Sequence, residues 1–121
     1  MQGFGDLIAG YRRFRDKRVS NDGELWRDLA EGQSPRAVII ACSDSRSDPA
    51  IVFDTDPGEI FVIRNVANLV PPFEQGGGRH GVSAALEFPV TQLGVPEITV
   101  MGHERCGGIN KPLGALPRVV L

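Results

Sequence analysis

The sequence lacks any long apolar run and has little excess charge of either sign. No stretch approaches the roughly 18 apolar residues that suggest a membrane-spanning helix. The N-terminus has no basic segment followed by a long apolar one, so we expect no signal peptide. The net charge of −2 over 121 residues leaves no electrostatic footprint for nucleic acid. We therefore expect a cytoplasmic protein without membrane or nucleic-acid partners.

Cysteine is also scarce, because the chain has two, Cys42 and Cys106. In a reducing compartment such cysteines serve more often as thiols or metal ligands than as a structural bridge. A reversible redox pair of the two cysteines stays open as an alternative, and it predicts no metal. The length of 121 residues suits one modest core and not two. We expect a single domain, 1–121, with an N-terminal helical arm, 1–32, inside it.

The apolar pattern predicts an α/β fold with a mainly parallel sheet flanked by helices. Helical spacing indicates two helices within the arm, the first from Phe4 to about Arg18 and the second ending before Gly32. Runs rich in β-branched residues predict strands buried on both faces at 37–42, 59–66 and 97–103. A helix is expected over 82–93, with Val82, Ala85, Leu86, Val90 and Leu93 on one face and a kink at Pro89.

Reactive side chains follow two of these strands. Cys42, Asp44 and Arg46 alternate at the end of the first strand, and His103 and Cys106 follow the last one. The carboxyl ends of parallel strands meet at one edge of a sheet, where ligands bind. Zinc favours thiolate sulfur and imidazole nitrogen in tetrahedral sites. The pattern therefore predicts a metal site built from Cys42, His103 and Cys106.

The fourth metal position can go either to water, in a catalytic site, or to Asp44, in a closed one. Arg46 bears on this choice, since a forked ion pair with its guanidinium would hold the Asp44 carboxylate away from the metal. Zinc can lower the pKa of a bound water towards neutrality. The residues alone therefore support a metal-dependent hydrolysis or hydration.

Four blocks in this order resemble a β-class carbonic anhydrase: "CSDSR" (42–46), "PGEIFVIRNVANLVPP" (57–72), "GVSAALEF" (81–88) and "GHERCGG" (102–108). The resemblance covers roughly residues 30–109. It implies one Zn²⁺ per chain on Cys42, His103 and Cys106. It also implies an enzyme, a lyase, that reversibly hydrates carbon dioxide to bicarbonate and a proton by zinc-hydroxide attack. Asp44 and Arg46 would be its catalytic pair, with Asp44 as fourth ligand in a closed state.

The resemblance further implies a substrate pocket and an oligomer, a homodimer or larger. The residues that match the family's substrate positions are Gln33, Phe61, Val66, Phe88 and Gly107. In the family, the residue at Gln33 usually reaches across a dimer interface. One subclass is switched off by bicarbonate through a pocket containing Trp and Arg. Here Arg64 remains but Ile39 stands at the Trp position, so we expect no such switch.

The chain departs from the family at Ser47, at Pro89 and in the tail. Pro89 stands where Ala is common. Ser47 stands where an apolar residue is usual, and the tail after Ile109 no longer resembles family members, which continue well beyond this point. The chain is therefore expected to be a C-terminally truncated or altered member, with the C-terminal part of the family sheet missing. Two alternatives stay open: a non-catalytic zinc-binding fragment, and a hydrolase of a related small substrate such as carbonyl sulfide.

Overall fold

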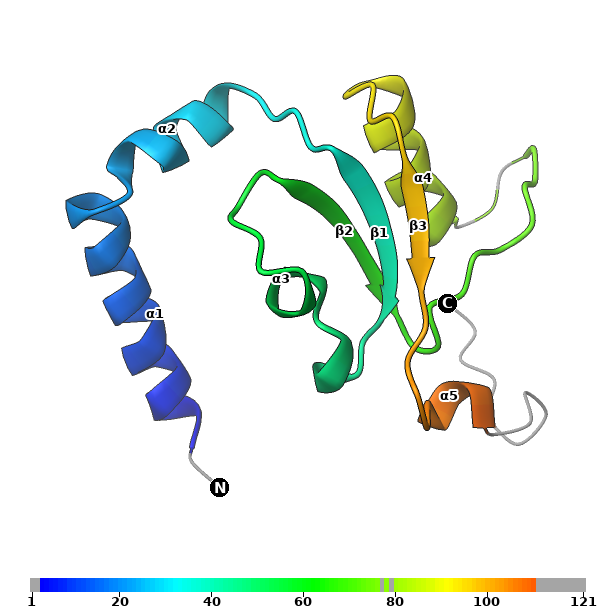
Figure 1. The fold of residues 1–121 in the computed structure, drawn as a ribbon, viewed down its shortest axis with the longest axis horizontal. Coiled ribbons are helices and arrows are strands. Elements are labelled where there is room, and N and C mark those ends of the chain that lie inside the picture. Colours follow the sequence, from blue (N-terminus) through cyan, green and yellow to red (C-terminus); the bar gives the residue numbers. More distant parts are fainter. Residues whose placement is uncertain (1–2, 77, 79, 111–121) are drawn as a thin grey trace. The chain divides into compact units, whose positions relative to one another are not determined.

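The computed structural model describes residues 3–76, 78 and 80–110, so most of the tail discussed above lies outside the described residues. The chain divides into two compact units, Met1–Gln33 and Ser34–Leu121. The boundary after Gln33 lies one residue beyond the expected helical arm. Figure 1 shows the elements of both units in chain order.

The first unit is a pair of helices, α1 (Phe4–Ser20) and α2 (Gly23–Glu31), as the sequence predicts. Lys17 and Arg18 in the last turn of α1 complement the negative end of the helix dipole. The rings of Phe14 and Trp26 meet edge to face with centroids 5.3 Å apart, and the Arg18 guanidinium lies 5.2 Å from the Trp26 ring. These contacts join the two helices. None of the residues of α1 is buried.

The second unit is built on a parallel sheet in the order β2-β1-β3, which confirms the predicted fold class. The strands are β1 (Ala37–Cys42), β2 (Ile60–Asn65) and β3 (Ile98–Met101). In the register, Val38 lies opposite Phe61 and Cys42 opposite Asn65. β1 is buried along nearly its whole length, because it is the central strand and its residues are apolar throughout.

The prediction of burial on both faces is wrong for β3 and also for β2, where Ile63 alone is buried and Val62 is 39% exposed. In β3, Ile98 and Val100 are 49% and 52% exposed. Among the described residues, β3 pairs with β1 alone, so it forms an edge of the sheet. The apolar composition of β3 is typical of a strand with a neighbour on each side. In the described part of the chain, however, β3 has a neighbour on one side only.

The longest helix of the second unit, α4 (Gly81–Thr91), packs on the sheet. Its Val82, Ala85 and Leu86, together with Leu93, contact a core cluster of Val38, Ile40, Ile63 and Val95. The expected apolar face is wrong at Val90, which is exposed. Pro89 lies in the last turn, where few helical hydrogen bonds remain to be lost, and its carbonyl accepts a hydrogen bond from Val95 N at 3.1 Å.

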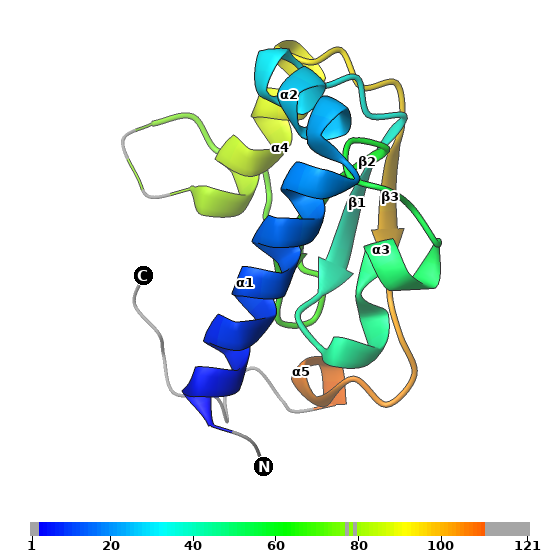
Figure 2. The same cartoon turned by 90° about the vertical axis from the view of Figure 1, so that its left-hand side faces the viewer.

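Three short helical segments were not predicted: the 3₁₀ turn Ser45–Ser47, α3 (Pro49–Val52) and α5 (Gly107–Asn110). α3 lies on the opposite side of the strands from α4 (Figures 1 and 2). The Asp48 carboxylate caps α3 by accepting a hydrogen bond from Ala50 N at 3.1 Å, and Pro49 follows at the first helical position. None of the described helices is both long and apolar enough to cross a membrane.

The core cluster generates a prediction for stability. Ile40 is fully buried at the centre of the sheet, so Ile40→Ala should leave a cavity and lower the free energy of unfolding by about 2–5 kcal/mol. The matched control is Ile51→Ala on α3, where the side chain is 76% exposed and the change should stay within about 0.5 kcal/mol. Denaturant unfolding of the metal-free protein measures both. Equal losses in the two variants would contradict this placement of the core.

Candidate metal centre

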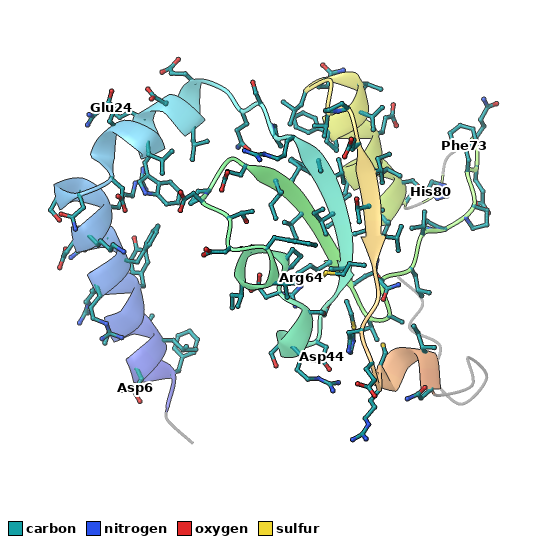
Figure 3. All side chains as sticks on the ribbon, in the orientation of Figure 1. Asp6, Glu24, Asp44, Arg64, Phe73 and His80 are labelled. Carbon is teal, nitrogen blue, oxygen red and sulfur yellow. The ribbon has the colours of Figure 1, made fainter. Side chains whose placement is uncertain are left out.

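The sheet brings Cys42, His103 and Cys106 to one edge. Cys42 ends β1, and the other two residues follow β3, which is the parallel neighbour of β1. One potential ligand atom from each residue lies within 4.8 Å of the other two. Figure 3 shows Asp44 and Arg64 at the same end of the strands. The predicted convergence of these three residues is therefore present in the structure.

The donor atoms suit a tetrahedral zinc ion. The sulfur atoms of Cys42 and Cys106 lie 3.9 Å apart. Two sulfurs bound to one zinc at about 2.3 Å would lie about 3.8 Å apart, whereas a disulfide requires about 2.05 Å. Both cysteines are free and buried. The spacing fits a shared metal ion better than a bridge.

His103 is held so that one ring nitrogen remains available. Its Nδ1 lies 3.1 Å from the carbonyl oxygen of Glu104, an arrangement in which Nδ1–H donates. Its Nε2 is buried and has no hydrogen-bond partner among the described residues. A buried imidazole nitrogen without a partner is costly unless something binds it. The backbone carbonyl thus selects the tautomer that presents the Nε2 lone pair to a metal.

Backbone N–H groups surround the sulfur of Cys42. The Ala67 N–H donates to Sγ at 3.3 Å and the Asp44 N–H at 3.5 Å. Burial raises the pKa of the Cys42 thiol, but these two donors, followed by His103 and Cys106, outweigh burial and lower the pKa to about 6. The site therefore favours thiolate before any metal arrives.

Ala67 was not singled out from the sequence. It has a positive φ of 72°, and the next residue, Asn68, has one of 46°. Such backbone is unfavourable for residues with a Cβ and is often found at functional sites. Here it turns the N–H of Ala67 towards the Cys42 sulfur. The motif "NVANL" carries no spacing signal that would reveal this turn.

Asp44 and Arg46 form the forked pair expected from their spacing. Asp44 Oδ1 accepts from Arg46 Nε at 3.0 Å and from its backbone N–H at 2.9 Å, and Oδ2 accepts from Nη2 at 2.9 Å. The side-chain hydrogen bonds from Arg46, with the backbone one next, hold the pKa of Asp44 well below its usual range. Arg46 Nη2 also donates to the Arg105 carbonyl at 3.3 Å. Asp44 is not part of the cluster of potential metal ligands in the described structure.

The second glycine after Cys106 allows close packing beside the site. A Cβ on Gly108 would lie 2.7 Å from Val66 Cγ1 and 2.9 Å from Ala67 Cβ, whereas one on Gly107 would meet no described atom within 4 Å. Gly108 therefore lets α5 approach the turn whose N–H reaches the Cys42 sulfur. Gly107 was expected beside the substrate, whereas the close approach at Gly108, the second glycine of the same pair, was not predicted.

The residues expected to bind substrate lie in separate places. Val66 packs beside Gly108, and Gly107 begins α5, so both lie near the metal ligands. The rings of Phe61 and Phe88 are 6.1 Å apart. Phe61, however, lies four residues before the partner of Cys42 in the register, about 13 Å along the strand. Gln33 is exposed at the end of the first unit. The roles of these residues stay predictions.

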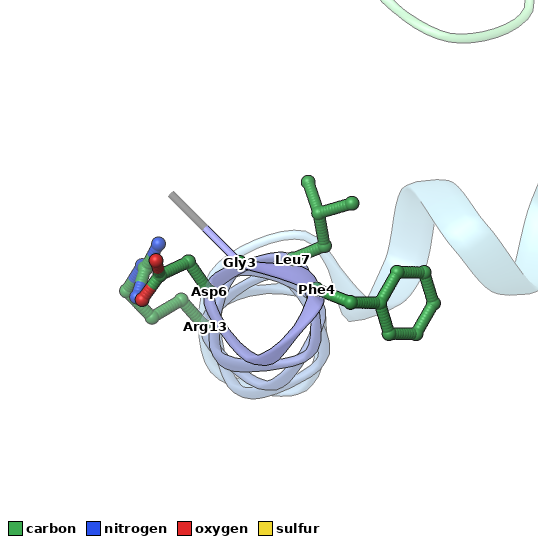
Figure 4. Close-up of a pocket in the computed structure, with 5 residues that line it drawn as sticks. All are labelled: Gly3, Phe4, Asp6, Leu7 and Arg13. Atoms are coloured by element: carbon green, nitrogen blue, oxygen red, sulfur yellow. The ribbon is translucent and has the colours of Figure 1, made fainter. Parts of the chain in front are cut away.

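Three hollows lie elsewhere, and none of them is lined by the three potential ligands. Figure 4 shows the one beside the first turns of α1, where Phe4 points away from Asp6 and Arg13, so these side chains do not enclose one site. A second lies within the helical arm, beside Trp26. The third is lined by residues of the segment 70–76, by Gly78 and His80, by α4 and by Ile98, and it includes Phe73.

Comparisons with known proteins agree with this site. Residues 37–118 match the family model described as "Carbonic anhydrase". The chain is 44% identical over 107 residues to "Beta carbonic anhydrase 5, chloroplastic" of Arabidopsis thaliana. The aligned region covers 88% of this chain and 35% of that relative.

Solved structures of β-carbonic anhydrases are similar to this chain in fold. The β-carbonic anhydrase CcaA superposes with a TM-score of 0.77 at 39% identity, covering 86% of this chain and 46% of that one. One of two tetrameric β-carbonic anhydrases of Sordaria macrospora gives a TM-score of 0.74 at 31% identity, covering 86% and 50%. The chain thus spans between about a third and a half of the length of these relatives.

The contact at Gly108 leads to a prediction with a built-in control. Gly108→Ala should force α5 away from Val66 and Ala67, because the added Cβ meets two atoms below 3.0 Å. Such overpacking costs about 1–3 kcal/mol of unfolding free energy and should also weaken zinc binding. Gly107→Ala adds the same methyl group in open space and should change neither quantity. Zinc titration and denaturant unfolding would contradict the contact if both variants behaved alike.

The environment of Cys42 predicts a low-pH thiolate in the metal-free protein. Absorbance near 240 nm, which reports thiolate, should rise in a step centred near pH 6, and Cys42→Ser should remove this step. Because the folded state lowers this pKa, thiolate formation stabilises the fold fully above the ordinary thiol pKa of about 8.5. That contribution is lost as the pH falls through about 6. A flat absorbance up to pH 8 would be inconsistent with the N–H donors described above.

Proposed function

This chain belongs to the β-class carbonic anhydrase family, and from that premise we propose that it is a zinc enzyme interconverting carbon dioxide and bicarbonate. The observation that carries the proposal is the set of three donor atoms within 4.8 Å of one another, beside a carboxylate fully engaged by an arginine. The reaction adds water to carbon dioxide and releases bicarbonate and a proton.

Cys42, His103 and Cys106 would hold one Zn²⁺. Bound there, zinc would supply a water of lowered pKa, and so a nucleophile at neutral pH. Three protein ligands leave one tetrahedral position for that water. The two thiolates together balance the charge of the ion, so the ligand set itself attracts no anion.

Asp44 would orient the nucleophile. Held by Arg46, its carboxylate stays ionised at neutral pH and can only accept hydrogen bonds. The carboxylate can therefore accept a hydrogen bond from a neighbouring oxygen that carries a proton, and it repels an anion that has no proton to donate. Arg46 fixes the direction of the carboxylate through its two side-chain bonds and is itself braced by the Arg105 carbonyl. This arrangement suits an uncharged substrate such as carbon dioxide.

We extend the proposal to a homodimer or larger oligomer. Within one chain, Phe61 and Phe88 lie together but about 13 Å along the strand from the level of Cys42. If they line the pocket that the family resemblance assigns to them, a second copy must bring its own Phe61 and Phe88 to the metal. The tetrameric state named for the Sordaria macrospora relatives supports this assembly. A cytoplasmic location is likewise proposed, from the free cysteines.

The length of the chain supports one competing function. Since it spans 35–50% of the compared relatives, a zinc-binding protein without catalytic activity is the second candidate. It would keep the same three ligands, so metal binding alone does not separate the two functions.

Zinc content and carbon dioxide hydration of the full 121-residue chain separate them. We expect one zinc per chain and rapid hydration in a stopped-flow assay with a pH indicator. Cys106→Ala should lose both. Asp44→Asn should keep the zinc but lower the hydration rate by about 10²-fold, the scale of a positioned proton-handling group.

The control for Asp44→Asn is Asp54→Asn, which makes the same chemical change at an exposed residue with a φ of 49° that asparagine tolerates. It should leave the rate unchanged. Activity per chain should also fall on dilution if the oligomer completes the pocket. One zinc without hydration would favour the non-catalytic protein, and failure to bind zinc would exclude both functions.

A further inference from the structure

Ser47 is the only polar residue that is buried as a whole in the part of the chain that the structure describes, with 2% of its surface exposed. It follows Arg46 directly and ends the 3₁₀ turn after β1. Its hydroxyl oxygen lies 3.0 Å from the Cys42 carbonyl oxygen and 3.1 Å from that of Asp44. A buried hydroxyl is costly unless it is hydrogen-bonded, so these contacts are a specific feature of the turn.

The hydroxyl has one proton and two candidate acceptors. The Asp44 carbonyl already accepts from the Ser47 N–H at 3.0 Å and from Arg64 Nη2 at 2.7 Å, which uses both of its lone pairs. The Cys42 carbonyl accepts from Arg64 Nε at 2.9 Å. The Ser47 hydroxyl therefore donates its hydrogen bond to the carbonyl oxygen of Cys42, which is a predicted metal ligand.

Arg64 approaches the same turn from the neighbouring strand. Its guanidinium leaves β2, reaches both carbonyls, and lies 3.5 Å from Asp48 Oδ2. Figure 3 shows Arg64 and Asp44 at this end of the strands. The backbone carbonyls of the turn at Cys42 and Asp44 therefore accept hydrogen bonds from two side chains. Arg64 belongs to the neighbouring strand, and Ser47 belongs to the turn itself.

We propose that Ser47 is a positioning residue of the metal site. Its hydroxyl fixes the Cys42 carbonyl, and through the short turn it keeps the Asp44 carboxylate on Arg46 and away from the metal. Without the hydroxyl, Arg64 alone holds the Cys42 carbonyl, and the turn gains freedom for Asp44 to become a fourth metal ligand. This inference rests on the proposed function, because it needs a metal at the three ligands.

Valine and threonine at position 47 test the hydroxyl at nearly constant shape. Each variant of the full chain is loaded with Co²⁺, and azide is titrated while the visible absorption of the cobalt is followed. Azide needs an open metal position, so its apparent affinity falls with the fraction of sites that Asp44 closes. We expect Ser47→Val to bind azide about three- to ten-fold more weakly than Ser47→Thr, as expected for one neutral hydrogen bond.

The matched control is Ser45→Ala. Ser45 is exposed in the same turn, and its hydroxyl makes no hydrogen bond with the described residues, so azide affinity should not change. Equal azide affinity in the valine and threonine variants would overturn the positioning role while leaving the proposed function intact. Failure of the unaltered chain to bind cobalt would overturn both.

A variant that no longer binds cobalt gives no azide titration. For such a variant, cobalt affinity is measured by competition with a chelator. Loss with valine but retention with threonine supports the role of the hydroxyl. If both branched residues prevent binding, Ser47→Ala removes the hydroxyl without adding bulk. Azide affinity in that variant equal to that of the unaltered chain would then overturn the inference, and three- to ten-fold weaker binding would support it.

Discussion

The parallel pairing of β1 with β3 is the interaction on which the site depends. Ala41 lies opposite Met101, so the residues that follow the two strands leave the sheet side by side. This register brings ligands that are 64 positions apart in the sequence to a sulfur–sulfur distance of 3.9 Å. A shift of one residue would point Cys42 to the other face of the sheet, because side chains alternate along a strand. The register therefore determines the ligand set.

Near this pairing of strands, the sulfur, carboxylate and carbonyl groups of the turn after β1 accept hydrogen bonds from nearby donors. The Cys42 sulfur is bordered by the N–H groups of Ala67 and Asp44, and the Asp44 carboxylate is matched by Arg46. The carbonyls of the same turn are matched by Arg64 and Ser47. These polar groups thus have partners either within the turn or on a neighbouring segment, whereas His103 Nε2 has none among the described residues. The turn is consequently cross-linked to β2 and to the loop after β3, and its geometry does not rest on its own five or six residues alone.

Much of this could be predicted from the sequence, because it depends on patterns that are local or periodic. The run 37–42 identified the central strand, and the spacing of Asp44 and Arg46 indicated their forked pair. The role of Ala67 could not be predicted, since a backbone N–H carries no side-chain signature. The exposure of Val90 and of β3 depends on which surfaces have neighbours, which composition does not encode. Gly108 could have been found, since paired glycines beside a ligand suggest a close approach.

The exposed outer side of β3 has a consequence for how firmly a metal would be held. An edge strand of four residues opens more readily than a central one, because fewer hydrogen bonds and buried contacts must break. Two of the three potential ligands, His103 and Cys106, follow β3, and the third, Cys42, is the last residue of β1. A local fraying of this edge would therefore release His103 and Cys106 together, while Cys42 stays in the core. The residence time of the ion would then be governed by the periphery of the sheet and by whatever covers it.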